Sequence, residues 1–254
     1  MKVRKLNKAN FETDFTTKKK GSLVDIKNNT AVTSIRELRI ILDISGSVKN
    51  YYKKMISLIK ESLYIIKNPL GCKIMVSISV FSTNHRVIVP FTNINDLNIE
   101  SIPFPDAYGY TRTGQAILES VDEVMSYYEN LKRAKKESGL EVYPPVVLLI
   151  TDGKTYGGQN ETDINQNWNK YKQAALKIQS LEKLPPSGLD KIAFFACGLE
   201  AMIGSASKQE LQMLTHYPER IFTASNSEFL KDSLAQVMSV SYTHLRAHET
   251  CADL

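Results

Sequence analysis

Four short strand-like segments, separated by longer stretches with helical periodicity, constrain the fold more than any other feature of the sequence. The segments are Leu38–Asp43, Lys73–Phe81, Val146–Thr151 and Lys191–Cys197. Short, nearly continuous apolar runs are typical of strands covered on both faces. Over residues 55–66, 117–131 and 168–181, apolar side chains instead recur with the 3.6-residue period of amphipathic helices. This alternation predicts a mainly parallel sheet with helices on both faces.

The remaining predicted elements are shorter. They are a strand at Arg86–Pro90, a helix at Lys208–Thr215, a last strand at Arg220–Thr223 and a closing helix at Glu228–Met238. We expect Arg86–Pro90 to be a short antiparallel edge strand, because only a brief turn separates it from the strand before it. Together these elements predict one α/β domain at residues 35–239, with a doubly wound, Rossmann-like sheet and no internal repeat.

The net positive charge of the chain is confined to its N-terminus. The 254 residues carry a formal charge of +5, and residues 1–20 alone hold seven Lys or Arg against two acids. The rest of the chain is therefore neutral, which argues against a general nucleic-acid surface. We interpret residues 1–34 as a basic polar arm, with one short apolar run at Leu23–Ile26 that could form an edge strand. A solvated arm is the simplest interpretation, and binding of an acidic partner, RNA or a membrane surface is the alternative.

The last fifteen residues differ in character from the domain before them. Segment 240–254 reads VSYTHLRAHETCADL and has no apolar period. It resembles the translation of a transposase adapter used to prepare DNA sequencing libraries, so we expect this segment to be non-native. His244 and His248 have the i, i+4 spacing of a zinc-binding helix face. We assign them no metal, because they lie in this segment.

Nothing in the sequence predicts export or insertion into a membrane. No stretch approaches the roughly 20 consecutive apolar residues of a membrane span, and no apolar core follows the basic N-terminal residues. Cys72 and Cys197 lie in or beside strand-like segments, where a small buried thiol is expected. We therefore expect a cytoplasmic protein without a membrane span.

Oxygen-bearing side chains gather at the predicted carboxyl ends of the strands, where open parallel sheets bind ligands. The first strand ends in Asp43, with Ser45 and Ser47 directly after it, and a later strand is followed by Asp152. Thr111 lies in the loop before the long predicted helix. The cluster offers two carboxylates and several hydroxyls but no nitrogen or sulfur. Such hard ligands favour Mg²⁺ or Mn²⁺ over zinc.

These residues resemble the metal-ion-dependent adhesion site (MIDAS) of the von Willebrand factor A (vWA) domain family. The family's Asp-x-Ser-x-Ser pattern is present as Asp43, Ser45 and Ser47; its Thr is matched by Thr111 and its second Asp by Asp152. The resemblance implies that the three hydroxyls bind the cation directly and that the two carboxylates act largely through water. It also implies that a carboxylate from a partner protein fills the open coordination position.

The chain departs from the family pattern in the loop before the Thr. The family usually has two glycines there, and here the second is Tyr110, a residue type that resists positive φ. Thr113 is a second candidate for the Thr ligand; we favour Thr111 and expect Thr113 to be a helix N-cap. The alternative interpretation of the site is that both Asp residues merely cap helices.

Within the family, the chain most resembles bacterial TerY-type proteins of the tellurium-resistance and stress-response group. The resemblance is carried by KIAFFACG at residues 191–198, by the long loop before Thr111 and by LAQV at residues 234–237. It implies an intracellular protein with kinase and phosphatase partners. Some such proteins carry a C-terminal zinc module, which an interrupted reading frame would have removed.

Two other functions compete with this interpretation. A phosphatase of the haloacid-dehalogenase type also uses Mg²⁺ and an Asp after its first strand, but it needs an acid where this chain has Ser45, whose hydroxyl cannot transfer a proton at neutral pH. Phosphate-loop and nucleophile-elbow motifs are absent, and His85 and His216 have no evident partner in the sequence. We therefore expect no enzymatic activity. The other competitor is a secreted or surface vWA adhesin, against which the lack of a signal sequence and of paired cysteines argues.

Overall fold

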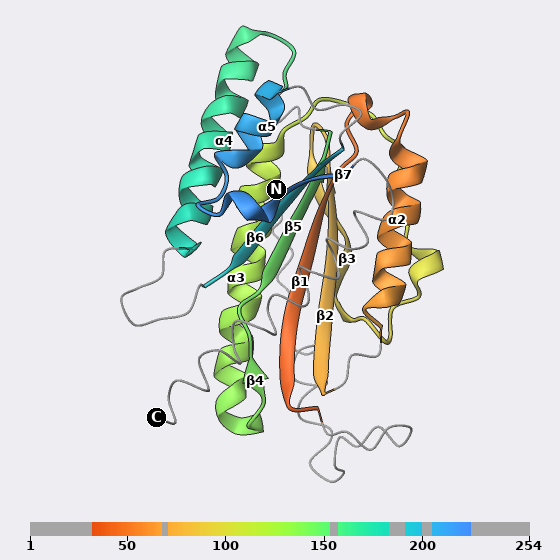
Figure 1. Ribbon diagram of the computed structural model, residues 1–254, viewed down its shortest axis with the longest axis vertical. Helices are drawn as coiled ribbons and strands as arrows, with labels where there is room; N and C mark the ends of the chain where they lie inside the picture. The colour runs from red at the N-terminus through yellow and green to blue at the C-terminus, as the bar shows by residue number, and fades with distance from the viewer. Residues whose placement is uncertain (1–31, 68–70, 153–156, 183–190, 200–204, 225–254) are drawn as a thin grey trace, which may run out of the picture.

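A seven-stranded, mainly parallel sheet crosses the centre of the domain (Figure 1). The computed structural model describes residues 32–67, 71–152, 157–182, 191–199 and 205–224. The strands are β1 (Ser34–Asp43), β2 (Cys72–Phe81), β3 (His85–Asn93), β4 (Glu141–Val142), β5 (Val146–Thr151), β6 (Ala193–Leu199) and β7 (Ile221–Ala224). Their order is β3-β2-β1-β5-β6-β7, with β4 pairing beside the start of β1. Strand β3 is antiparallel to β2, and the predicted fold class is confirmed.

Helices cover both faces of this sheet. Helix α2 (Tyr52–Ile65) packs on one face, and α3 (Thr113–Ser138), α4 (Glu161–Glu182) and α5 (Ser205–Gln212) lie on the other (Figure 1). The short 3-10 helices are η1 (Gly46–Val48), η2 (Ile99–Ser101) and η3 (Pro218–Arg220). Because successive strand residues point to opposite faces, Ile40 and Leu42 of β1 join the core under α2, whereas Ile41 joins the core under α3 and α4. In the part of the chain that the structure describes, no helix is both long and apolar enough to cross a membrane.

The strand order reverses beside β1, and this reversal positions the candidate site. From β1 the chain adds β2 and β3 on one side of the sheet, and after α3 it adds β5, β6 and β7 on the other side. Strands β1 and β5 are neighbours, with Leu42 opposite Ile150. Their carboxyl ends therefore meet at the same edge, which is where open α/β sheets bind ligands.

Strand β1 begins four residues earlier than the sequence predicted. The added residues include Arg36 and Glu37, which are only 3% and 1% exposed. Charged residues are rarely buried to this extent, so their presence argued against a strand before Leu38. The structure corrects the start of β1 to Ser34.

The buried charges of β1 are accommodated in three different ways. The Arg39 guanidinium donates to the Glu123 carboxylate of α3 at 2.7 Å, and the Arg36 guanidinium lies over the Tyr143 ring. Neither carboxyl oxygen of Glu37 has a hydrogen-bond partner among the described residues. Burial instead raises the pKa of Glu37 to about 9, against a smaller lowering by Arg39, so its carboxyl group is neutral at pH 7.

Several other predicted elements need correction. Strand β3 extends to Asn93, and its Pro90 is compatible with pairing because β3 lies at the edge of the sheet. The helix predicted from the periodicity of residues 55–66 is α2, which begins at Tyr52 and is preceded by η1, and the two-residue strand β4 was not predicted. The predicted run at 23–26, the closing helix at 228–238 and segment 240–254 lie outside the described residues.

Candidate metal centre

The turn after β1 is built around a buried carboxylate. Asp43 ends β1 with no solvent exposure. One of its oxygens accepts a hydrogen bond from the Ser45 amide at 2.8 Å, and the other accepts from the Thr151 hydroxyl at 2.8 Å. Because Thr151 ends β5, this second bond ties the two strand ends together. Both carboxylate oxygens are thereby held in fixed directions.

The serine hydroxyls of this turn have the spacing of neighbouring metal ligands. Ser45 is buried, Ser47 is exposed within η1, and their Oγ atoms lie 3.0 Å apart. Adjacent oxygens in an octahedron with bonds of about 2.1 Å are about 3 Å apart. The two hydroxyls therefore fit one edge of a Mg²⁺ coordination shell.

Two acids share this edge of the sheet. Asp152 directly follows β5 and is 2% exposed. Burial, together with repulsion from Asp152, raises the pKa of Asp43 to about 7, although the bonds from Ser45 and Thr151 oppose the rise. Paired buried carboxylates repel each other unless a cation or a proton neutralises them. A bound cation would therefore stabilise this arrangement of charges.

The loop that carries Thr111 is fastened to the turn after β1. The Gly46 amide donates to the Gly109 carbonyl at 3.0 Å, and the Tyr108 amide donates to the Ile44 carbonyl at 2.7 Å. Gly109 has φ of +84°, which only glycine adopts readily, and an added Cβ would lie 2.6 Å from Thr83 Oγ1. Of the two positions at which the family usually has glycine, the one with positive φ is residue 109, which is still glycine in this chain.

The turn between β2 and β3 holds the loop that carries Thr111 through two hydrogen bonds. The Tyr110 amide donates to Thr83 Oγ1 at 3.0 Å, and the Arg112 amide donates to the Ser82 carbonyl at 3.1 Å. These two bonds flank Thr111 on either side in sequence. They fix the backbone of the expected ligand without using its side chain.

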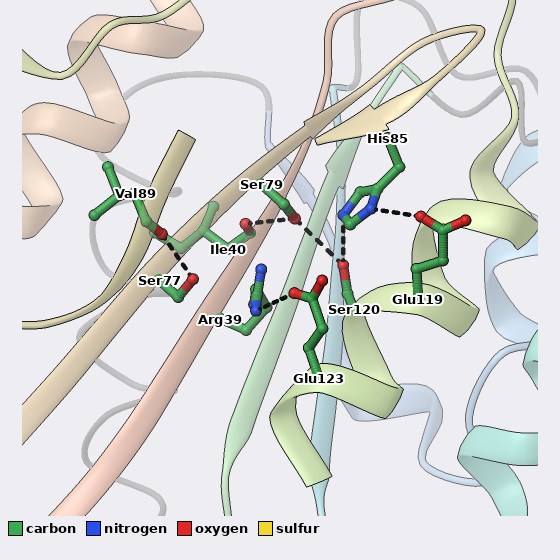
Figure 2. Close-up of polar contacts among 9 residues, drawn as sticks. All are labelled: Arg39, Ile40, Ser77, Ser79, His85, Val89, Glu119, Ser120 and Glu123. Atoms are coloured by element: carbon green, nitrogen blue, oxygen red, sulfur yellow. Dashed lines mark hydrogen bonds and ion pairs between the residues drawn. The ribbon is translucent and has the colours of Figure 1, made fainter. Parts of the chain in front are cut away.

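A series of polar side chains, buried at Ser79 and Ser120 and exposed at Glu119, anchors this turn to α3 (Figure 2). His85, the first residue of β3, lies with Nδ1 2.9 Å from the Glu119 carboxylate and with Nε2 3.0 Å from the Ser120 hydroxyl. Ser120 Oγ lies 3.3 Å from Ser79 Oγ on β2. Burial lowers the pKa of His85, although Glu119 opposes this, so the neutral ring donates from Nδ1 and accepts at Nε2. His85 had no evident partner in the sequence, and the structure corrects this with Glu119 and Ser120.

The loop after β5 approaches Thr111 from the other side. An added Cβ on Gly157 would lie 3.3 Å from the Thr111 amide nitrogen, so the two backbones nearly touch. Arg112 forms an ion pair with Asp163 in the first turn of α4 at 3.1 Å. The carboxylate of Asp163 also accepts from the Gln159 amide at 3.1 Å. Thr111 therefore lies between the loops that follow the two ligand-bearing strands.

Thr113 does not have the role that the sequence suggested. It is the first residue of α3, it is fully buried, and its Oγ1 has no hydrogen-bond partner among the described residues. A capping hydroxyl would accept a bond from a backbone amide of the first turn. The expected N-cap at Thr113 is therefore wrong.

The contacts that support the candidate site have no signal in the sequence. Thr151 appeared only as the end of a strand, and nothing in the sequence linked Thr83 or Asp163 to Thr111. In the described ranges, no group of three or more His, Cys, Asp or Glu side chains could hold a metal ion. The candidate site is not such a group, because its oxygen donors are mainly Ser and Thr hydroxyls.

A comparison with protein families agrees with this arrangement of strand ends and hydroxyls. The sequence profile of the von Willebrand factor type A domain matches residues 37–236. The chain belongs to this family. The match includes all five residues of the candidate vWA metal site, and vWA domains generally mediate protein–protein interactions. No curated protein is significantly similar to the chain in sequence.

Solved structures with this vWA fold come from distant proteins. The pilus adhesin SpaC from Lactobacillus rhamnosus GG has a TM-score of 0.56 and 14% identity, over 84% of this chain and 30% of that chain. Proximal thread matrix protein 1 from the mussel byssus, solved with a zinc-occupied MIDAS motif, has a TM-score of 0.50 and 16% identity, over 83% and 46% of the two chains. A von Willebrand factor type A protein from Catenulispora acidiphila has a TM-score of 0.50 and 14% identity, over 84% and 44%.

These similarities show the fold of the chain and nothing finer. The matched region spans less than half of each of the three solved chains. The ligand residues and partners of this vWA domain must therefore be argued from its own side chains.

Proposed function

We propose that this vWA domain binds Mg²⁺ or Mn²⁺ through Asp43, Ser45, Ser47, Thr111 and Asp152 and uses the cation to bind a partner protein. The observation that carries the proposal is the pair of serine hydroxyls held 3.0 Å apart beside two buried carboxylates. In this assignment the hydroxyls of Ser45, Ser47 and Thr111 contact the cation, and the carboxylates act largely through water. We assign Thr111 rather than Thr113, because Thr113 is enclosed within the first turn of α3.

The charge of the donor set favours an acidic partner. Three neutral hydroxyls leave a divalent cation under-neutralised, and Mg²⁺ retains exchangeable waters. A partner Asp or Glu side chain can replace one water and supply the missing negative charge. Zinc occupies the MIDAS motif of the mussel protein, but an all-oxygen donor set favours Mg²⁺ or Mn²⁺ in this chain.

The surroundings of the site favour binding over catalysis. The residue two positions after Asp43 is Ser45, which cannot serve as the general acid of a haloacid-dehalogenase phosphatase. His85 contacts Ser120, but Ser120 is fully buried and cannot reach a substrate. We therefore propose a non-enzymatic function.

We further propose a cytoplasmic, TerY-like function in chemical-stress or tellurium resistance, with a kinase or phosphatase of a Ter-type system as partner. The residues at 191–198 and 234–237 and the long loop before Thr111 support this assignment. Ter-type, kinase or phosphatase genes beside the source gene would strengthen it. Recovery of the native protein outside the cytoplasm would instead favour the alternative, a secreted or surface adhesin.

Metal binding and partner binding can be tested with one pair of variants. Asp43→Ala should abolish the rise in melting temperature that MgCl₂ or MnCl₂ causes in the full chain, with little change in the circular dichroism spectrum. The matched control Asp106→Asn, which alters an exposed acid, should retain the metal-induced rise. In pull-downs from the native host, the partner should be retained with Mg²⁺ and lost with EDTA. A partner retained equally with EDTA and by Asp43→Ala would refute the proposed interface.

A further inference from the structure

Three large apolar side chains remain exposed around the candidate metal site. Tyr108 is 58% exposed, Tyr110 is 41% exposed and Ile164 is 37% exposed. Large aromatic and branched side chains are normally covered, and a group of them beside a polar site is typical of an interaction surface. We call these three residues the apolar rim.

The two tyrosines of the apolar rim are presented by a rigid backbone. The Tyr108 amide is bonded to Ile44, which lies between Asp43 and Ser45 in the turn after β1. The Tyr110 amide is bonded to Thr83 Oγ1, and Tyr110 directly precedes Thr111. Each tyrosine is therefore fixed by a backbone bond within one or two residues of an expected metal ligand. Ordering these rings on binding costs little conformational entropy, because the loop is already held.

Ile164 lies on the opposite side of the site from the tyrosines. Its backbone nitrogen would lie 2.8 Å from a Cβ added to Gly158, and the adjacent Gly157 nearly touches the Thr111 backbone. Tyr110 is held by the turn after β2, whereas Ile164 belongs to α4, which follows β5. Because β2 and β5 flank β1 on opposite sides, the apolar rim borders the metal turn on both sides.

We propose that this face binds a segment of a partner protein in which an acidic residue is flanked on both sides by aromatic or other large apolar residues. The inference rests on the proposed function, since the acid is the residue that completes the cation site. The flanking side chains would cover Tyr108 and Tyr110 on one side and Ile164 on the other. Each apolar contact adds affinity through burial, whereas a glycine-flanked acid leaves the apolar rim exposed.

The charge beside the site argues against basic flanking residues. Lys49 is exposed, and its amide donates to the Gly46 carbonyl in the same turn that carries Ser45 and Ser47. A Lys or Arg next to the partner acid would be repelled by the bound divalent cation, and Lys49 adds a further positive charge to the same turn. Repulsion between like charges weakens binding, so apolar neighbours are favoured over basic ones.

The proposal can be tested with three immobilised peptides and the full chain in saturating MgCl₂. The sequences are Gly-Phe-Asp-Phe-Gly, Gly-Gly-Asp-Gly-Gly and Gly-Phe-Asn-Phe-Gly. We expect the first to bind on the order of ten-fold more tightly than the second, and the third to bind no more tightly than the second. EDTA should abolish binding of the first peptide.

Variants of the apolar rim separate its contribution from that of the metal. The double variant Tyr108→Ser with Tyr110→Ser should remove the preference for Phe-flanked Asp while leaving the affinity for Mn²⁺, measured by calorimetry, unchanged. The control Leu176→Ser, which alters an exposed apolar residue on α4, should leave both unchanged.

The possible outcomes distinguish failure of this inference from failure of the proposed function on which it rests. Normal Mn²⁺ binding with equal affinity for the Phe-flanked and Gly-flanked Asp peptides, or with no detectable binding of either, would overturn the inference alone. A preference retained by the double tyrosine variant would also overturn it. Failure of the wild-type chain to bind Mn²⁺ or Mg²⁺ would overturn the proposed function and the inference with it.

Discussion

Replacing Glu37 with Gln should stabilise the protein, because it removes an ionisable group from a buried strand. Glu37 is 1% exposed on β1, and neither carboxyl oxygen has a hydrogen-bond partner among the described residues. Burial raises its pKa from 4.5 to about 9, and Arg39 opposes this only in part. The folded protein must therefore hold a proton at pH 7 that the unfolded chain releases. A glutamine of the same shape avoids this requirement.

The magnitude follows from the linkage between protonation and folding. Between pH 4.5 and about 9, the unfolded state binds fewer protons at this position than the folded state, so stability falls by about 1.4 kcal/mol per pH unit as pH rises. At pH 7 the accumulated loss is about 3 kcal/mol, and it should be absent below pH 4.5. Glu37→Gln should therefore be about 3 kcal/mol more stable than wild type at pH 7 and nearly equal to it at pH 4.

Urea denaturation of both proteins between pH 4 and pH 9 would measure this difference. The matched control Glu219→Gln changes an exposed glutamate on η3 and should show no comparable dependence on pH. The reasoning would be refuted if the difference between Glu37→Gln and wild type were constant with pH, or if the variant were less stable at pH 7.

Two further predictions concern other parts of the fold. Glu182→Ala should lower the free energy of unfolding by about 3 kcal/mol in urea titrations, because it leaves the largely buried Arg220 guanidinium without this carboxylate; a loss below about 1 kcal/mol would contradict a structural role. Gly109→Ala should weaken Mn²⁺ binding in calorimetry, because the new Cβ meets Thr83 Oγ1 at 2.6 Å and displaces the loop that carries the Thr ligand. The control Gly139→Ala, at φ of +70° with open space around it, should cost about 1 kcal/mol of stability and leave metal binding unchanged.

The parts of the fold that sequence could predict are those in which burial follows a simple period. Strand β5 is apolar up to its last residue, Thr151, and was predicted with its observed bounds, Val146–Thr151. The start of β1 could not be predicted in this way, because Arg36 and Glu37 are buried before Leu38, and the Arg36 guanidinium lies over the ring of Tyr143, a residue far away in the chain. Neither Arg36 nor Tyr143 alone indicates that the two side chains will pack together.

The candidate site also has one part that the sequence predicts and another that it does not. Asp43, Ser45 and Ser47 form a local pattern that the sequence displays directly. The bond from Thr151 to Asp43 joins residues 108 positions apart, and it depends on the register between β1 and β5. Sequence could therefore suggest the ligands, but it could not suggest the contacts that orient them.

The series of side-chain contacts from Ser120 through His85 to Glu119 bears on how active sites are recognised in protein structures. Its connectivity, hydroxyl to imidazole to carboxylate, is the same as in a serine hydrolase, and its distances of 3.0 and 2.9 Å are equally short. Yet the hydroxyl is fully buried in the sheet–helix interface, so no carbonyl carbon can approach it. A template of three side chains would classify this protein as a hydrolase. A template that also requires solvent access to the nucleophile would reject it, and access is therefore the property on which such assignments should depend.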